Sequence, residues 1–272
     1  MKKILCPTDF SDTARNAVTY AAKLAHKLDA ELTLFNVQSL GDLTPEEAAW
    51  GEDVNVGVAA EQLESLCLEV RKVFKVSCYP AMTTSLMTVN NRIGDIAGAF
   101  DLIVMGTDGP DDMFQFLMGS HTYQVIKKTS TPVLLVPKDC GYSDITSTAY
   151  AFDYQHNPVL PLSHLLPVLK PFGTTLAVVA VTGGSRHEDD TLEIEAFSRR
   201  VTELHKDGIQ AEFHLVRADD PVKGMDQFVI ENKMDLLVLC SVHHNFIHRL
   251  FHKSVIRSVT AMAHYPVLVF HA

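Results

Sequence analysis

The sequence DLIVMGTDG, residues 101–109, combines an acidic residue, four apolar residues and a turn with two glycines. Residues 235–239, DLLVL, repeat its first half 134 positions later, and residues 101–138 align with 235–272 without a gap. Near the start of each half the offset is 144. Self-similarity over this length is typical of a tandem duplication, so the sequence predicts two related domains.

Each copy alternates short apolar or β-branched runs with segments in which apolar residues recur at helical spacing. The expected strands lie at residues 3–8, 31–37, 76–80, 101–106 and 132–136 in the first copy, and at 150–152, 175–181, 210–216, 236–239 and 266–270 in the second. Apolar strands that alternate with helices form parallel sheets covered on both faces. The sequence therefore predicts an α/β fold of two tandem, open, five-stranded parallel sheets of Rossmann-like type, in residues 1–140 and 147–272.

The two copies are joined by a polar stretch, residues 138–147, which contains a glycine and has no apolar periodicity. The difference between the offsets of 144 and 134 gives the first copy ten extra residues. We place them between Gly41 and Gly57, a segment with several acids and the only tryptophan, Trp50. Such a composition predicts a surface loop.

The composition excludes several classes of protein. The chain has 272 residues, of which 47% are apolar and 21% charged, and its net charge is −10. An acidic chain without a basic block favours neither nucleic acid nor an anionic membrane surface, and no apolar run approaches the roughly 20 residues of a membrane span. Pro7 interrupts the first apolar run too early for an export signal. The five cysteines are scattered without a C-x-x-C pair, so we expect a cytoplasmic protein with reduced thiols, and the sequence gives a redox role only weak support.

The glycines after the run at 101–106 follow the spacing G-x2-G-x9-G-S, and they are Gly106, Gly109 and Gly119, with Ser120 after the last. Glycine allows a positive φ and a close approach of the backbone to a ligand. Ser120 precedes a helix expected over 121–129, whose free N–H groups favour an anion. The alternative is that the glycines only turn the chain and that Ser120 only caps the helix.

These features together resemble the universal stress protein family. The resemblance rests on the glycine spacing, on the run before it, on VIKKTSTPVLLVP at 125–137 and on KKILCPTDFS at 2–11, and it extends over both copies. It implies an adenosine-nucleotide site, for ATP or AMP, in the first copy. The implied contacts are Pro7, Thr8 and Asp9 to adenosine, Val37 to the base, Met105 and Gly106 to the ribose and phosphates, and Gly109, Gly119, Ser120, His121 and Thr122 to the phosphates.

The loop departs from the family in its acids, Asp108, Asp111 and Asp112. A carboxylate about 6 Å from a phosphate costs roughly 3 kcal/mol at an effective dielectric constant near 20. A bridging Mg²⁺ would reverse the sign, so ATP should need Mg²⁺ or bind weakly, and AMP should suffer least. The alternative is that the acids point into solvent. Asp9 likewise has a second role open to it, as N-cap of a helix starting near 11–12.

The second copy lacks the glycine loop, because Cys240, His243 and Lys253 replace the three glycines and only Ser254 remains. We therefore expect no nucleotide there. Its first helix should be short or kinked, since four prolines lie in it: Pro158, Pro161, Pro167 and Pro171. The i, i+4, i+8 set of His244, His248 and His252 could supply a pair of metal ligands, but its ends are over 10 Å apart along a helix, so no metal site is predicted.

The resemblance implies a cytosolic, non-enzymatic stress-response protein, and no G-x-S-x-G nucleophile motif argues otherwise. Two alternatives remain open: a ligand-free interaction scaffold, or a slow ATPase that uses His121 or that autophosphorylates at Ser120 or Thr122. The family also pairs domains through their last strands, here 133–136 and 267–270. We accordingly expect pairing within one chain, and in addition a homodimer of chains.

Overall fold

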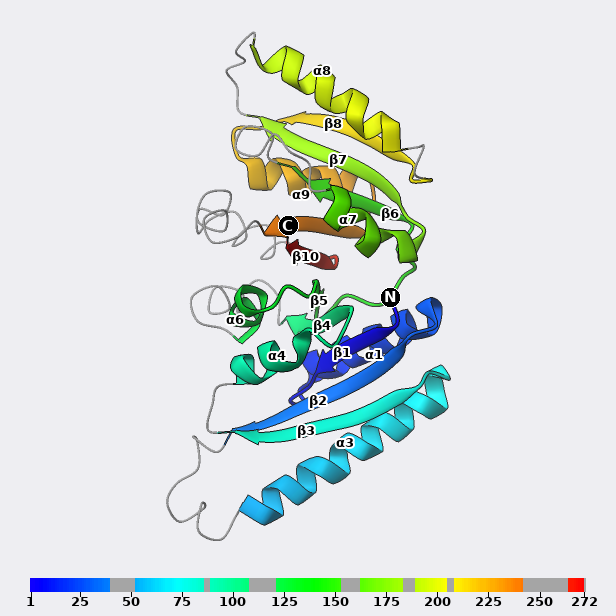
Figure 1. Cartoon of the computed structure of the whole chain (residues 1–272), viewed down its shortest axis with the longest axis vertical. Coiled ribbons are helices and arrows are strands. Elements are labelled where there is room, and N and C mark those ends of the chain that lie inside the picture. The colour runs from blue at the N-terminus through cyan, green and yellow to red at the C-terminus, as the bar shows by residue number, and fades with distance from the viewer. Residues whose placement is uncertain are drawn as a thin grey trace. The chain divides into compact units, whose positions relative to one another are not determined.

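A computed structural model describes residues 1–39, 52–85, 89–107, 121–152, 162–182, 189–204, 208–241 and 264–271 (Figure 1). The described residues divide into two compact units, and the chain passes from the first to the second between Tyr142 and Ser143. That point lies inside the polar stretch that joins the two copies of the repeat. Each unit is an α/β layer structure, as the sequence predicts.

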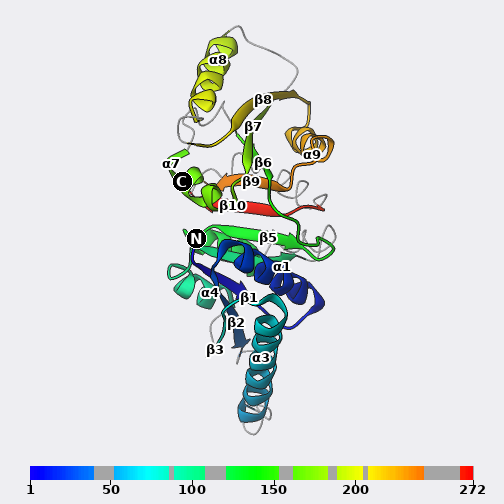
Figure 2. The ribbon, with the colours of Figure 1, turned by 90° about the vertical axis from the view of Figure 1, so that its right-hand side faces the viewer.

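The first unit has a parallel sheet with the strand order β3-β2-β1-β4-β5. Its elements are β1 (Lys3–Pro7), α1 (Asp12–Leu28), β2 (Glu31–Ser39), α3 (Glu52–Phe74), β3 (Cys78–Ser85), α4 (Val89–Ala97), β4 (Leu102–Thr107), α6 (His121–Lys128) and β5 (Val133–Pro137). Helix α1 packs beside α3, and α4 packs beside α6. Figure 2 shows α1 and α4 on opposite sides of the strands, so both faces of this sheet are covered.

The second unit repeats this order as β8-β7-β6-β9-β10, again with parallel pairs. Its elements are β6 (Ser147–Ala151), α7 (Leu162–Leu169), the 3-10 turn η1 (Lys170–Phe172), β7 (Thr175–Thr182), α8 (Asp189–Thr202), β8 (Ala211–Arg217), α9 (Pro221–Glu231), β9 (Leu236–Ser241) and β10 (Val267–His271). Helices α8 and α9 lie on opposite sides of its strands (Figure 2). Helix α7 has only eight residues and contains Pro167, which confirms the expected short helix.

The strand registers confirm the duplication. Ile103 pairs with Val133 in the first unit, and Leu237 pairs with Val267 in the second, which is the offset of 134 at both positions. The pair Lys3 and Glu31 corresponds in the same way to Ser147 and Thr175, at the offset of 144. The two offsets read from the sequence are therefore the offsets of the folded units.

An aspartate carboxylate is hydrogen-bonded to the start of the neighbouring strand at the amino edge of each sheet. In the first unit, the carboxylate oxygen Oδ2 of Asp101 accepts hydrogen bonds from the N–H groups of Lys2 and Lys3, at 2.6 and 3.0 Å. In the second, Asp235 Oδ2 accepts from the backbone N–H and the hydroxyl of both Thr146 and Ser147, at 2.8 to 3.1 Å. The aspartate that opens DLIVM and DLLVL thus ties β4 to β1 and β9 to β6.

Some expected boundaries are wrong. Strand β3 runs to Ser85 instead of ending at Pro80, because every residue from Cys78 onward pairs with β2, including polar residues that give no apolar signal. Strand β6 begins at Ser147 instead of Tyr150, because it is the central strand and its Thr148 is buried with a hydrogen bond to Thr174. Backbone pairing, rather than side-chain hydropathy, sets both limits.

The expected loop between Gly41 and Gly57 is wrong over its last part, because α3 already begins at Glu52. An alanine at position 57 would have no atom within 4 Å of its Cβ, so this glycine lies on the open side of the helix. A glycine inside a helix costs only about 1 kcal/mol, which the packing of the following turns outweighs. Those turns bury a stripe formed by Ala59, Leu63, Leu66, Cys67 and Val70. Residues 40–51 lie outside the described part of the chain.

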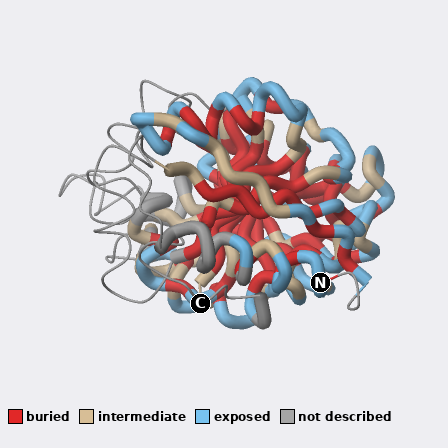
Figure 3. Tube along the Cα trace, turned by 90° about the horizontal axis from the view of Figure 1, so that it is seen from above, coloured by how far each residue is buried: buried red, intermediate tan, exposed pale blue. Residues whose placement is uncertain are grey.

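The buried residues gather along the strands, as Figure 3 shows, while the outer sides of the helices are exposed. Among the described residues, no helix combines the length and the apolar character that crossing a membrane requires. The sheet edges at the strand termini are the places where loops could hold a ligand.

Candidate functional site

The structure brings the segments after β1 and at the end of β4 to one edge of the first sheet. These two strands are parallel neighbours, with Ile4 beside Leu102 and Leu5 beside Ile103. Their carboxyl ends therefore meet at the same edge, where ligands bind in open parallel sheets. This edge carries the predicted residues Pro7, Thr8, Asp9, Met105 and Gly106.

Thr8 and Val37 lie on adjoining strands at this edge. The Thr8 N–H donates to the carbonyl oxygen of Phe35 at 2.9 Å, and the Asn36 side-chain amide donates to the Thr8 carbonyl oxygen at 2.8 Å. Val37 follows Asn36 in β2 and is half-buried. It is thus an apolar side chain with part of its surface free beside the loop after β1, as contact with a base requires.

Asp9 is held in place by Ser11. Asp9 Oδ1 accepts from the Ser11 N–H at 3.0 Å and from the Ser11 hydroxyl at 2.6 Å. Its second oxygen, Oδ2, makes no hydrogen bond within the described residues, and the side chain is exposed. The carboxylate is therefore oriented through one oxygen and leaves the other for a donor such as a ribose hydroxyl or an amine.

The N-cap role considered for Asp9 is wrong. The N-cap of α1 is Ser11, whose side chain accepts from the Ala14 N–H at 3.2 Å. Phe10 takes a positive φ of 66° between the two residues, with its N–H donating to the Thr8 hydroxyl at 3.1 Å. This turn moves Asp9 out of the capping position and leaves it at the sheet edge.

Gly106 differs from its expected role. It has no positive φ and pairs with Val136 inside β4, so it does not turn the chain. A Cβ at this position would lie 2.7 Å from the Thr13 carbonyl oxygen and 2.8 Å from Thr13 Cγ2. The missing side chain therefore gives room to the first turn of α1.

Thr107, the last residue of β4, is a candidate that sequence reasoning missed. Its hydroxyl is buried and has no hydrogen-bond partner in the part of the chain that the structure describes. A buried hydroxyl without a partner costs about 1–3 kcal/mol, so a partner is expected. The sequence pointed to Thr107 only through its position between the first two glycines of the G-x2-G-x9-G-S spacing.

The rest of the predicted phosphate loop lies outside the described residues. This applies to Gly109, Gly119 and Ser120, and also to the acids Asp108, Asp111 and Asp112. Helix α6 begins at His121, directly after Ser120, as the sequence predicts. His121 and Thr122 are placed as backbone in its first turn, without a description of their side chains.

The corresponding edge of the second unit is filled by side chains. Cys240 stands at the position of Gly106 and pairs with Phe270 in the strand register. Burial raises the pKa of Cys240 to about 12, and the neighbouring Tyr150 side chain partly offsets this rise. Phe152, the counterpart of Thr8, stacks on Phe197 with ring centroids 4.2 Å apart and planes within 10°. Both of these rings are buried.

The predicted polar residues of this second edge fall elsewhere. Asp153, His243, Lys253 and Ser254 lie outside the described residues, as do His244, His248 and His252. Within the described ranges, no group of three His, Cys, Asp or Glu side chains could hold a metal ion.

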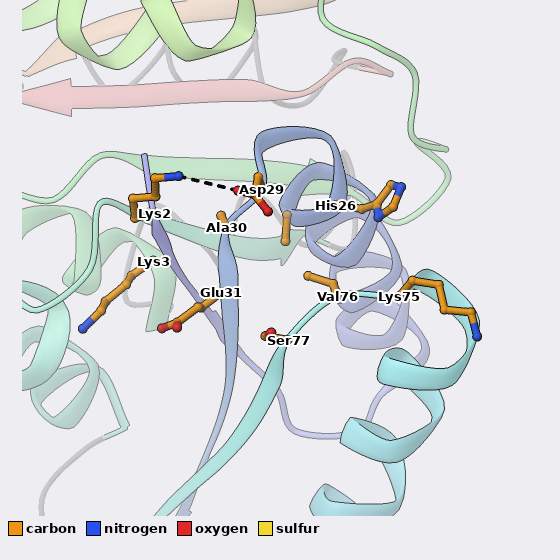
Figure 4. A pocket seen from close by; sticks show the side chains of 10 residues that line it. Lys2, Lys3, His26, Asp29, Ala30, Glu31, Lys75, Val76 and Ser77 are labelled. Carbon is orange, nitrogen blue, oxygen red and sulfur yellow. Dashed lines mark ion pairs between the residues drawn. The ribbon is translucent and has the colours of Figure 1, made fainter.

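A hollow of about 500 Å³ lies at the opposite, amino edge of the first sheet (Figure 4). It is lined by Lys2, Lys3, Ala25, His26, Asp29, Ala30, Glu31, Lys75, Val76 and Ser77. An ion pair between Lys2 Nζ and Asp29 Oδ2, 3.8 Å apart, joins two exposed side chains. Exposed charges of both signs are screened by solvent and bind little, so we assign the site to the carboxyl edge.

Comparison with known proteins places both units in one family. The sequence profile of the universal stress protein family matches residues 1–78, 95–137 and 162–271. Universal stress protein Slr1230 of Synechocystis sp. is 25% identical over 292 aligned positions, which cover 99% of this chain and 100% of that protein. Universal stress protein MJ0531 of Methanocaldococcus jannaschii is 34% identical over 142 positions, covering 50% of this chain and 82% of that protein.

Among solved structures, a universal stress protein from Archaeoglobus fulgidus superposes with a TM-score of 0.74. The superposition covers 99% of this chain and 98% of that one, at 19% sequence identity. At this identity the likeness concerns the fold of the two-unit chain.

Proposed function

This chain belongs to the universal stress protein family, and on that premise we propose that its first unit binds an adenine nucleotide, ATP or AMP, at the carboxyl edge of β1 and β4. The second unit binds none and serves pairing and interaction. The protein acts as a cytosolic, non-enzymatic nucleotide-binding protein of the stress response.

The Asp9 carboxylate carries the proposal. Two hydrogen bonds from Ser11 fix its orientation, and its Oδ2 is left without a protein donor within the described residues. A charged acceptor bound to a ligand donor is worth about 1.5–3 kcal/mol. The half-buried Val37 lies in β2, which is separated from β4 by β1, and it supplies apolar contact for a base at the same edge. A nucleoside offers both a polar and an apolar surface of this kind.

Two features support binding of the phosphates beyond the nucleoside. Helix α6 begins at His121, and the first N–H groups of a helix have no partner within the helix and favour an anion. The buried Thr107 hydroxyl ends β4 without a partner among the described residues and could donate to a phosphate oxygen. The acids of the 108–112 loop make Mg²⁺ the expected companion of ATP, because a divalent cation offsets their charge.

The contrast between the units supports a single site. Phe152 and Phe197 stack where Thr8 opens the loop in the first unit, and Cys240 adds a side chain where Gly106 has none. A nucleotide would have to displace these buried rings, which favours a scaffold role for the second unit. Pairing of β5 with β10 within one chain, and a homodimer of chains, remain predictions from the sequence.

The absence of enzymatic activity is also proposed. Of the described side chains at the end of β1 and β4, Asp9 is the titratable one, and Ser11 already engages one of its oxygens. General acid–base chemistry needs a group free to exchange a proton near the reacting atom. Phosphate release from ATP that disappears in the Gly119→Lys variant would instead favour the slow ATPase.

The test uses the full chain. The purified protein is denatured and its released small molecules are identified by mass spectrometry, and the thermal midpoint is then measured with ATP and AMP, with and without Mg²⁺. Ligand at 100 times its Kd should add about 2.7 kcal/mol of stability. Asp9→Ala should abolish the shift, whereas Asp153→Ala, the aligned change in the second unit, should leave it intact. No released nucleotide and no shift in any condition would favour the ligand-free scaffold.

A further inference from the structure

Two buried cysteines from different elements meet on one face of the first sheet. Cys67 lies in α3 and Cys78 is the first residue of β3, and both side chains are fully buried. The two sulfurs lie within reach of a hydrogen bond, and each shifts the pKa of the other. The pair is not a C-x-x-C motif and becomes visible only because the chain reverses between α3 and β3.

A separate contact, made by Arg71, holds the two segments that carry the thiols together. Arg71 lies one helical turn after Cys67, on the same side of α3. Its Nε donates to the carbonyl oxygen of Cys78 at 2.7 Å, and its guanidinium also lies 3.4 Å from Glu64 Oε1. The arginine therefore holds the end of α3 against the start of β3 at the point where the thiols meet.

The surroundings make the two thiols unequal. The hydrogen bond from Cys78 and the charge of Arg71 lower the pKa of Cys67 in spite of its burial. The same hydrogen bond, with burial, raises the pKa of Cys78. The direction of the Cys67 shift favours its thiolate, and Arg71 supplies positive charge beside both sulfurs. Such an assignment is that of an attacking and a resolving thiol.

The other three cysteines lack this arrangement. Burial raises the pKa of Cys6 and of Cys240 to about 12, and it also raises the pKa of Cys140. None of these three has a hydrogen bond to another thiol in the described structure. Cys140 and Cys240 are internal controls for any chemistry of the pair, whereas Cys6 lies close enough to Cys78 to raise its pKa.

We propose that Cys67 and Cys78 form a redox site that closes to an intrachain disulfide on reaction with hydrogen peroxide. The Cys67 thiolate attacks one peroxide oxygen, the O–O bond breaks, and the hydroxide that leaves takes up a proton to become water. The Cys78 sulfur, as its proton is lost, then attacks the Cys67 sulfenic acid; the S–S bond forms and the S–O bond breaks, releasing a second water. Two thiols are oxidised and one peroxide is reduced to two waters.

The site is gated by its burial. Since neither sulfur is exposed, peroxide reaches it when the junction of α3 and β3 opens locally, and opening of this kind is a property of helix ends and sheet edges. Strand β3 stands at the end of the strand order of the first unit, and β2 is its one pairing partner among the described strands of that unit. The inference is independent of nucleotide binding, because it uses no residue of the carboxyl edge.

The experiment treats the native full-length chain with hydrogen peroxide, blocks remaining thiols in denaturant with N-ethylmaleimide and maps the peptides. We expect a loss of about 2 Da from the unlabelled chain, two fewer labelled thiols, and a cross-linked peptide that contains Cys67 and Cys78. Cys67→Ser and Cys78→Ser should each abolish that cross-link, whereas Cys140→Ser should keep it. Arg71→Met should slow its formation several-fold, because the thiolate loses its nearby positive charge.

Three results would overturn the proposal. One is full labelling of both cysteines after peroxide treatment of the native chain. Another is a cross-link that involves Cys6, Cys140 or Cys240 as often as the pair. The third is equal rates and equal pairings in the native and the urea-unfolded chain, which would show that the folded geometry contributes nothing. The peptide map of the wild-type chain tests the proposed disulfide even if a serine variant does not fold.

Discussion

Replacing Gly106 by alanine should displace the first turn of α1 and weaken both the fold and the nucleotide site. The added Cβ would lie 2.7 Å from the Thr13 carbonyl oxygen, 2.8 Å from its Cγ2 and 3.1 Å from its carbonyl carbon. Two of these three atoms belong to the backbone, so rotation of a side chain cannot relieve the contact. Forcing extra volume into a packed site costs typically 1–3 kcal/mol.

The same change reaches the site because α1 begins with its cap, Ser11, which also orients Asp9. A loss of about 2 kcal/mol should lower the thermal midpoint by about 4–8 °C for a chain of this size. Nucleotide affinity should fall as well, since the carboxylate moves with the cap. The assay is thermal unfolding followed by circular dichroism, combined with nucleotide titration.

Gly57→Ala is the control for this prediction. Nothing lies within 4 Å of the new Cβ in the interior of α3, so this change should stabilise by up to about 1 kcal/mol. Equal thermal midpoints for wild type and Gly106→Ala, with unchanged nucleotide affinity, would refute the close packing of α1 on β4 and its link to Asp9.

Three further changes test separate parts of the structure. The hydrogen bond from the Lys2 N–H is the main cause that lowers the pKa of Asp101 from 3.8. The stability that the Asp101 carboxylate contributes is therefore present above pH 3.8 and is lost as the pH falls through the folded pKa. The difference in urea midpoint between wild type and Asp101→Asn should shrink from pH 6 to about pH 3. Thr107→Val should leave the ligand-free urea midpoint unchanged or raise it, while nucleotide affinity falls; a marked loss of stability would mean that the hydroxyl is already bonded. Tyr265→Phe removes the hydroxyl that donates to buried Asp226 at 2.8 Å and should lower the free energy of unfolding in urea by about 1–3 kcal/mol. Adding Asp226→Leu to this variant should restore part of that loss. An unchanged free energy of unfolding in Tyr265→Phe would contradict the bond.

The sequence was sufficient for the fold because its two copies constrain each other. The offsets of 134 and 144 locate equivalent strands, and the paired residues of β4 with β5 and of β9 with β10 follow the same offsets. The ends of strands were harder to predict, since β3 continues through polar residues to Ser85 by backbone pairing alone.

The site was predictable as a place but not in its contacts. Residues 9–12 contain Asp9, Ser11 and Asp12, and any of these side chains can cap a helix. The local sequence does not predict the positive φ of Phe10. Because of this turn, Ser11 is the N-cap of α1 and Asp9 is not.

Gly106 shows a similar limit of pattern reading, because a glycine spacing reveals where a Cβ is missing but not what fills the space. The structure places Thr13 there. The pairing of Cys67 with Cys78 was likewise invisible, and the weak support for a redox role followed from the lack of a local motif. Both features depend on segments that meet only after the chain has folded.

The number of nucleotides bound per chain tests the central claim most directly. Isothermal titration of the nucleotide-free full chain with AMP, and with ATP in the presence of Mg²⁺, should give one site per chain that is lost in Asp9→Ala and kept in Asp153→Ala. Two sites per chain, or one site that survives Asp9→Ala and disappears in Asp153→Ala, would contradict a nucleotide site confined to the first unit.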